Sequence, residues 1–217
     1  MTGIHLAAVL AFLISSSHTW AMGEKDGDCL FIVAQLPIVK DSQIQASLER
    51  AMQNAIREEE VLSQIVKRLH TLEVTGGPDA LFSLSILNEM GSCVEADPVK
   101  ARSLLTRAAE LGNADAQTYL GLKQTDCKQA VYWWEKAALQ GDAAALKALA
   151  RTYHTGCPTV EKDSVLALMW LTVCDVSGID TVIPNLERHN YIDGMRDDQI
   201  AEAERLAREW VDKNLKK

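Results

Sequence analysis

The sequence lacks the short motifs that mark common catalytic and metal sites. It has no C-x-x-C, H-x-x-x-H or G-x-S-x-G spacing and no phosphate loop. Such motifs place metal ligands, a serine nucleophile or a cradle of backbone amides at a fixed spacing. We therefore predict no catalytic residue, no metal site and no cofactor, and we interpret the chain as a non-enzyme.

Basic residues are also scarce. The chain has 22 Lys and Arg against 30 Asp and Glu, a net charge of −8. Nucleic acids and anionic membranes bind basic patches that neutralise their phosphates, so this balance argues against both as partners. The one basic cluster is the tail with Lys213, Lys216 and Lys217, which we interpret as the solvated end of a last helix.

Long apolar runs are absent, and the longest unbroken short run lies near the N-terminus. "LAAVLAFLI" (Leu6 to Ile14) is too short to span a bilayer. Thr19 and Ala21 follow as small residues before a cleavage point. We predict a signal peptide over residues 1–21, no membrane insertion after its cleavage, and a periplasmic or secreted location. An uncleaved anchor stays open, because the segment before the run has no Lys or Arg.

The predicted export bears on whether the five cysteines form disulfides. Cysteines pair in an oxidising compartment, and an odd number leaves one as a thiol or bound to another chain. The five are Cys29, Cys93, Cys127, Cys157 and Cys174.

A repeat runs through the middle of the chain. Similar segments recur around Gly76, Gly112, Gly141 and Gly178, at spacings of 36, 29 and 37 residues. A period in this range is typical of stacked helical hairpins.

The second helix of each repeat carries a stripe of small residues. Seven residues separate Ala101 from Ala108, Ala130 from Ala137, and Ala167 from Cys174, and Ala109 and Ala138 follow. These positions share one helix face. Within the stripe, Trp133 and Trp134 stand where the first repeat has leucines. We predict that both indoles are core and that the alanines let helices approach closely beside them.

The ends of the expected helices have their own signals. We expect first helices to begin at Ala80, Ala116 and Ala145, and two of them to end at Gly91 and Gly156. Gly112 and Gly141 are expected to end second helices, since glycine tolerates the left-handed conformation found there. Asp97 and Asp163 are predicted N-caps, with Pro98 as a first helical residue.

These features resemble the Sel-one-like repeat family, relatives of the tetratricopeptide repeats. The resemblance is carried by Leu120-Gly121, Leu149, Tyr153, Gly156, "VEKD" (Val160 to Asp163) and above all "AVYWWEKAALQGDAAA" (Ala130 to Ala145). It implies an all-α, right-handed solenoid of stacked hairpins that binds a protein or peptide on its concave face. Exported bacterial members act as adaptors in envelope assembly, polysaccharide export, signalling or host contact.

The predicted organisation follows from the repeats. After the signal peptide come an N-terminal arm (22–40), a degenerate repeat or N-terminal cap (41–79), repeats at 80–115, 116–144 (shortened) and 145–182, and C-terminal capping helices (183–217). One long coiled-coil helix for dimerisation is the alternative for the degenerate segment. The last helix, from Asp197 or Asp198, buries Ile200, Ala203, Leu206, Ala207, Trp210 and Val211; a membrane-lying helix is disfavoured by its mixed charges.

Two further hypotheses concern the turns and the surface. Cys93, Cys127 and Cys157 each fall in the turn of their repeat, so we predict one bridge between neighbouring turns, with Cys93–Cys127 preferred. Cys174 on the apolar stripe is a predicted buried thiol. Ser103, Tyr132 and Met169 share a register position beside the core and form the predicted binding surface.

The favoured function is an exported scaffold for protein–protein interaction. The alternative is a cysteine-containing secreted hydrolase of β-lactam or cell-wall substrates, since a cysteine-rich branch of the family has been linked to penicillin binding. It would use His154, Cys157 and Asp163, because a Cys–His pair can form a thiolate nucleophile.

Overall fold

The computed structural model describes residues 33, 36, 41–52, 58–91, 93–178 and 185–215. The predicted signal peptide and most of the arm at 22–40 lie outside these residues. Contacts divide the chain into two compact units, one up to Leu105 and one from Thr106, and each is described by itself.

The described residues form an all-α structure, as predicted. Within them, the only strand-like pairing is an isolated bridge between Cys157 and Val160. The helices are α3 (Ser42–Met52), α4 (Glu58–Thr75), α5 (Pro78–Met90), α6 (Pro98–Glu110), α7 (Ala114–Leu122), α8 (Cys127–Ala138), α9 (Ala143–Thr155), α10 (Ser164–Ser177), α11 (Asn185–Ile192) and α12 (Asp197–Asn214).

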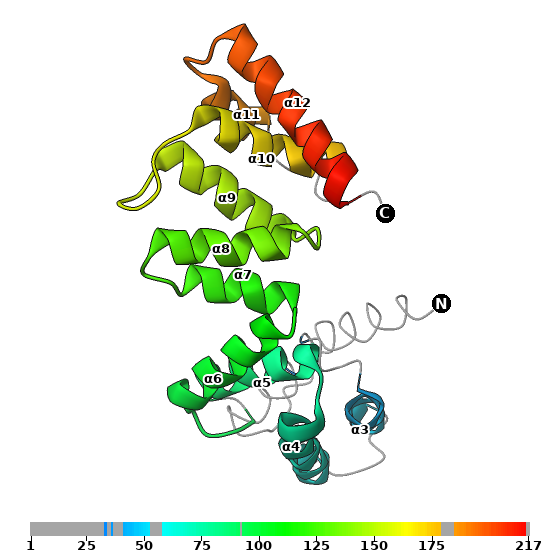
Figure 1. Ribbon diagram of the computed structural model, residues 1–217. Helices are drawn as coiled ribbons and strands as arrows, with labels where there is room; N and C mark the ends of the chain where they lie inside the picture. Colours follow the sequence, from blue (N-terminus) through cyan, green and yellow to red (C-terminus); the bar gives the residue numbers. More distant parts are fainter. Residues whose placement is uncertain are drawn as a thin grey trace. The chain divides into compact units, whose positions relative to one another are not determined.

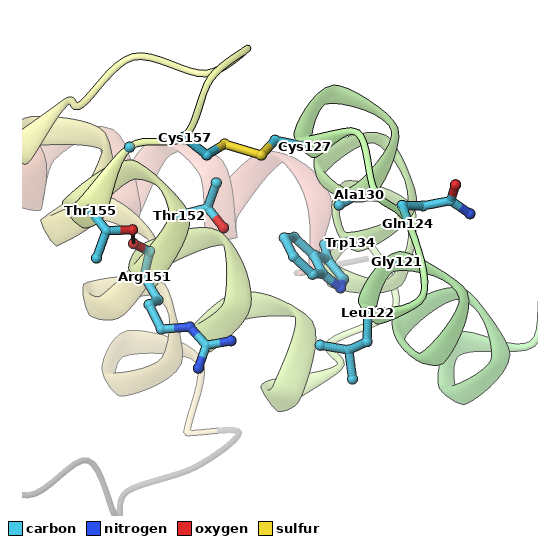
Figure 2. A pocket seen from close by; sticks show the side chains of 11 residues that line it. Gly121, Leu122, Gln124, Cys127, Ala130, Trp134, Arg151, Thr152, Thr155 and Cys157 are labelled. Carbon is cyan, nitrogen blue, oxygen red and sulfur yellow. Dashed lines mark hydrogen bonds between the residues drawn. A yellow bond between two sulfur atoms is a disulfide. The ribbon is translucent and has the colours of Figure 1, made fainter.

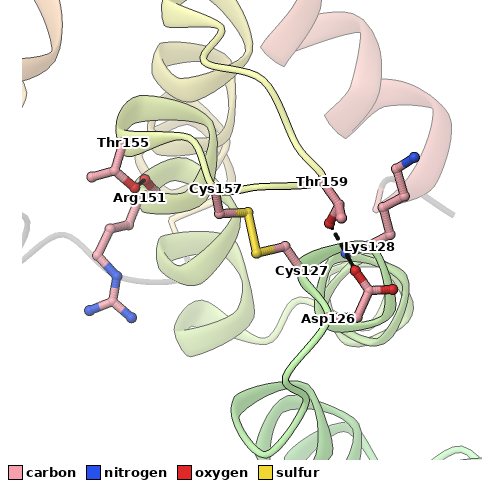
Figure 3. Close-up of a disulfide and its surroundings, with 7 residues drawn as sticks. All are labelled: Asp126, Cys127, Lys128, Arg151, Thr155, Cys157 and Thr159. Carbon is pink, nitrogen blue, oxygen red and sulfur yellow. Dashed lines mark hydrogen bonds between the residues drawn. A yellow bond between two sulfur atoms is a disulfide. The ribbon is translucent and has the colours of Figure 1, made fainter.

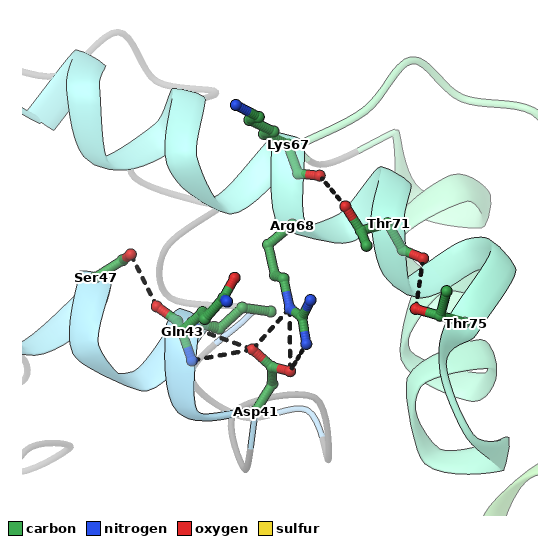
Figure 4. A network of polar contacts seen from close by, with 8 residues as sticks. Asp41, Gln43, Ser47, Lys67, Arg68, Thr71 and Thr75 are labelled. Carbon is green, nitrogen blue, oxygen red and sulfur yellow. Dashed lines mark hydrogen bonds and ion pairs between the residues drawn. The ribbon is translucent and has the colours of Figure 1, made fainter.

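In the first unit, α3 and α4 form an antiparallel hairpin. The start of α3 meets α4 through Asp41, whose Oδ2 accepts a 2.6 Å hydrogen bond from Nη2 of Arg68 (Figure 4). Further along α3, the side chains of Ser47 and Arg50 both donate hydrogen bonds to Oε1 of Gln64 on α4. The alternative of one long helix over this segment is therefore wrong, because the two helices pack side by side.

The end of α5 and the start of α6 lie at the predicted signals. Gly91 ends α5 with a left-handed φ of 70°. Asp97 precedes α6, and its Oδ1 accepts from the backbone amides of Val99 and Lys100, while Pro98 is the first helical residue. The amide of Asp97 also donates to the carbonyl of Asn88 at 2.9 Å, which fixes the turn between the helices.

In the second unit, α7 to α10 form two stacked hairpins. Helix α8 lies between α7 and α9, and α10 lies between α9 and α12 (Figure 1). The seam between them is built from the predicted small residues, which are at most 4% exposed: Ala130, Ala137, Ala138, Ala167 and Cys174. The predicted stack of helical hairpins is thus confirmed.

The first helices start two residues earlier than predicted. The side chains of Asn113 and Asp142 accept hydrogen bonds from the amides of Ala116 and Ala145, at 2.6 and 2.7 Å. An N-cap accepts from the amide three residues on. The alanines taken as helix starts are therefore the third helical residues.

The prediction that both adjacent indoles are core holds for only one of them. Trp134 is 7% exposed, whereas Trp133 is half-buried and makes an edge contact with Tyr132. Successive residues are about 100° apart around a helix, so only one of the pair can face the seam squarely. At the register of Trp133, Trp170 is buried because Trp210 of α12 packs against it, with ring centroids 5.2 Å apart.

Helix α12 closes the array as predicted. It begins at Asp197 and buries Ala203, Ala207 and Val211 in the core, with Ile200, Leu206 and Trp210 packed at the edge. Arg188 of α11 joins the last three helices, since it bonds Asp175 of α10 at 3.1 Å and Glu204 of α12 at 3.2 Å.

We predict that Asp41→Asn destabilises the first unit in a pH-dependent way. The Arg68 hydrogen bond, helped by the backbone amides of Ile44 and Gln43, lowers the pKa of Asp41 below its ordinary value. A depressed carboxyl pKa contributes stability above the unfolded-state pKa and loses it as the pH falls through the folded-state pKa.

Urea unfolding at pH 7 should show a loss of about 1 kcal/mol for this variant, because the partners keep some solvent contact. The loss should vanish at a pH below the folded-state pKa, where the wild-type carboxyl is also neutral. An equal loss at both pH values would contradict the assignment.

Candidate functional site

In the second unit, a groove lies between the second repeat of the chain (α7 and α8) and the third repeat (α9 and α10). Its volume is 230 Å³. Figure 2 shows Trp134 of α8 between residues at the end of α7 and residues of α9. The lining residues are Gly121, Leu122, Gln124, Cys127, Ala130, Trp134, Arg151, Thr152, Thr155, Gly156 and Cys157.

The position of the Trp134 indole depends on Gly121. A Cβ added at Gly121 would lie 2.7 Å from Cδ1 of the indole, which is sterically forbidden, and 3.0 Å from Cε2, which is unusually tight. The indole Nε1 donates to the carbonyl of Thr118 at 3.2 Å. With its polar group satisfied inside the core, Trp134 contributes an apolar ring surface to the groove.

A disulfide forms one wall of the groove. Cys127 at the start of α8 bonds Cys157 after α9, with Cα atoms 6.6 Å apart (Figure 3). Beside it, Oδ1 of Asp126 accepts from the hydroxyl of Thr159 at 2.8 Å and from the amide of Lys128. These hydrogen bonds lower the pKa of Asp126, so the carboxylate ties the loop after α9 to the α8 N-terminus.

The predicted Cys93–Cys127 bridge is wrong. A bridge between neighbouring turns is present, but Cys127 pairs with the following turn rather than the preceding one. The turn before α8 is short, so Cys127 is the first residue of that helix, which packs against α9. Cys93 is disulfide-bonded as well. Cys174 is a buried thiol, as predicted.

Arg151 is the one charged residue among those that line the groove. Its side chain is exposed. The residues three and four positions away on α9 are Lys147, Ala148, His154 and Thr155, so no carboxylate lies one turn away. No ion pair of Arg151 occurs within the described residues.

The residues of the hydrolase alternative do not form a site. Cys157 is held in the disulfide, which removes the thiolate that this hypothesis needs. His154 packs against the ring of Tyr191 at 4.5 Å. Asp163 caps α10 by accepting from the amide of Leu166 at 2.9 Å. In the described part of the chain, no three His, Cys, Asp or Glu residues gather as metal ligands.

The three residues of the predicted binding surface have different environments. Tyr132 is 47% exposed, and its ring lies 5.1 Å from that of Trp133. The ammonium of Lys136 lies over both rings, at 4.5 and 5.1 Å from their centroids. We name Tyr132, Trp133 and Lys136 the α8 aromatic cluster. Ser103 of the first unit is also exposed.

Met169 does not belong to this surface, contrary to the prediction. It is 6% exposed and lies in a core cluster that includes residues of α12. The repeat alignment places it beside the core, but α11 and α12 pack on α10 and cover that position.

Comparison with known proteins identifies the repeats. The family model of the Sel1 repeat matches residues 78–113, 114–142 and 143–172. No curated protein matches the chain. Among the described helices, none is long and apolar enough to cross a membrane.

Two solved structures are similar in fold. A Sel1 repeat protein from Oxalobacter formigenes is 25% identical, with a TM-score of 0.46, over 68% of this chain and 99% of that one. The protective antigen c5321 of uropathogenic Escherichia coli, which displays an SLR fold, is 21% identical with a TM-score of 0.44. That alignment covers 84% of this chain but 46% of the antigen, so this chain spans about half of its length.

We predict that removing the Cys127–Cys157 disulfide destabilises the second unit strongly. The bond closes a loop with a sequence separation of 30, for which the chain-entropy model gives about 2–4 kcal/mol. The double variant Cys127→Ser/Cys157→Ser should lose this amount in urea unfolding under oxidising conditions. With reductant present, wild type and variant should unfold alike; a difference that persists would contradict the explanation.

Proposed function

Because the chain belongs to the Sel1-repeat family, we propose that it is a non-enzymatic scaffold that binds a protein partner after export into an oxidising compartment. Sel1-repeat proteins in general mediate protein–protein interaction. The proposal adds that the protein is exported and that the partner binds at a particular surface of the second unit.

The observation that carries the proposal is the α8 aromatic cluster. Tyrosine and tryptophan are enriched among the residues that dominate binding energy, because they offer a large rigid area with a polar edge. Tyr132 is the most accessible aromatic ring of the cluster, and Leu139, the C-cap residue of α8, is 49% exposed two turns later. Exposed apolar side chains therefore lie on both sides of the cationic group of Lys136.

The disulfide supports the proposed export. Disulfides persist in secreted and periplasmic proteins and are rare in reducing cytosol. A structural bond between two repeats agrees with the short apolar run at Leu6 to Ile14, which is typical of a signal peptide.

We expect a photoreactive amino acid at position 132 to crosslink a specific protein in the native host. The same label at Ala201, an exposed position of α12 outside the cluster, is the control. Trp133→Ala should lower the capture by the position 132 label at least fivefold, because the neighbouring indole supports the contact. Equal capture from both labelled positions would contradict a contact at the cluster.

We further expect residues 1–30 to export a reporter enzyme that is active only outside the cytosol. Replacement of Leu10 and Phe12 by Asp should abolish reporter activity, since the translocation machinery requires an apolar run. The mature chain should begin at Met22 in N-terminal sequencing. Reporter activity that survives the double substitution would rule out export by this segment.

A further inference from the structure

We propose that the groove between the second and third repeats binds an extended segment of a partner in which an acidic side chain adjoins an aliphatic one. The inference rests on the proposed scaffold function and adds the chemistry of the partner. The partner would contact the α8 aromatic cluster with one part of its chain and the groove with another.

The charge of the groove selects the acidic side chain. Arg151 is the one charged lining residue, it is exposed, and no carboxylate of α9 lies one turn from it. A guanidinium binds a carboxylate through two parallel hydrogen bonds, so this position is complementary to Asp or Glu although the whole chain carries −8.

The opposite side of the groove selects the aliphatic side chain. Leu122, at the end of α7, is 55% exposed, and the ring of Trp134 lies between it and Arg151 (Figure 2). Burying an aliphatic side chain on these two surfaces is favourable because it removes apolar area from water. Polar groups of Gln124 and Thr152 line the same groove and suit the amide groups of an extended backbone.

The groove is rigid before it is occupied. The Cys127–Cys157 bond and the Asp126–Thr159 hydrogen bond both join α8 to the segment after α9. Gly121 and Trp134 fix α7 against α8. A preformed site loses less conformational entropy when it binds, which suits capture of a flexible segment.

The test is a selection of random twelve-residue peptides, displayed on phage, on the immobilised oxidised full chain. We expect enrichment of peptides with Asp or Glu next to Leu, Ile, Val or Met. Synthetic versions, measured by fluorescence anisotropy, should bind Arg151→Glu at least tenfold more weakly than wild type. The control Arg107→Glu makes the same charge change at an exposed position of α6 and should bind within twofold of wild type.

Four outcomes would overturn the inference. Three are the recovery of no binding peptide, enrichment without acidic residues, and equal affinity for wild type and Arg151→Glu. The fourth is a wild-type dimer that Arg151→Glu dissociates in sedimentation, because the occupant would then be a second copy of this chain. None of these affects specific crosslinking at position 132, so failure of the groove is distinguishable from failure of the scaffold function.

Discussion

The close approach of helices along a seam of alanines is the constraint on which the second unit depends. Ala137 and Ala138 are fully buried, so α8 can pack closely against its neighbours and leave room for one large side chain. That side chain is Trp134, and it fits because Gly121 has no Cβ. The wide indole and the narrow alanines are therefore one packing solution, since a bulkier residue at either place would force the helices apart.

The same packing creates the groove. The turn between α7 and α8 is shorter than those of the other repeats, and α8 begins at Cys127. Its first turn then lies beside the segment after α9, where Cys157 and Thr159 bond to it. Beside this link, Arg151 is exposed and the buried Trp134 lines the groove. A deletion in one repeat thus supplies both the covalent link and the opening beside it.

The periodic features were predictable from the sequence, and the pairwise ones were not. Recurring glycines and alanines predicted the hairpins. Asp97 and Asp163 marked helix starts through local side-chain hydrogen bonds, and Pro98 did so through its fixed backbone angle. The disulfide partner of Cys127 depends on which neighbouring turn lies closer, which is a property of tertiary packing. Met169 was misplaced because repeat alignment ignores the helices that cover the last repeat. The role of Arg188 had no signal in the sequence, because its partners Asp175 and Glu204 come together only through the packing of the last helices.

The disulfide between adjacent repeats changes how this array can unfold. In a linear array each repeat is held only by its neighbours, so the end units can fray one by one while the centre stays folded. Here Cys127 and Cys157 belong to adjacent repeats, and neither repeat can drift from the other without a broken covalent bond. The two repeats should consequently open as a single cooperative block, and loss of the terminal helices alone would leave that block assembled.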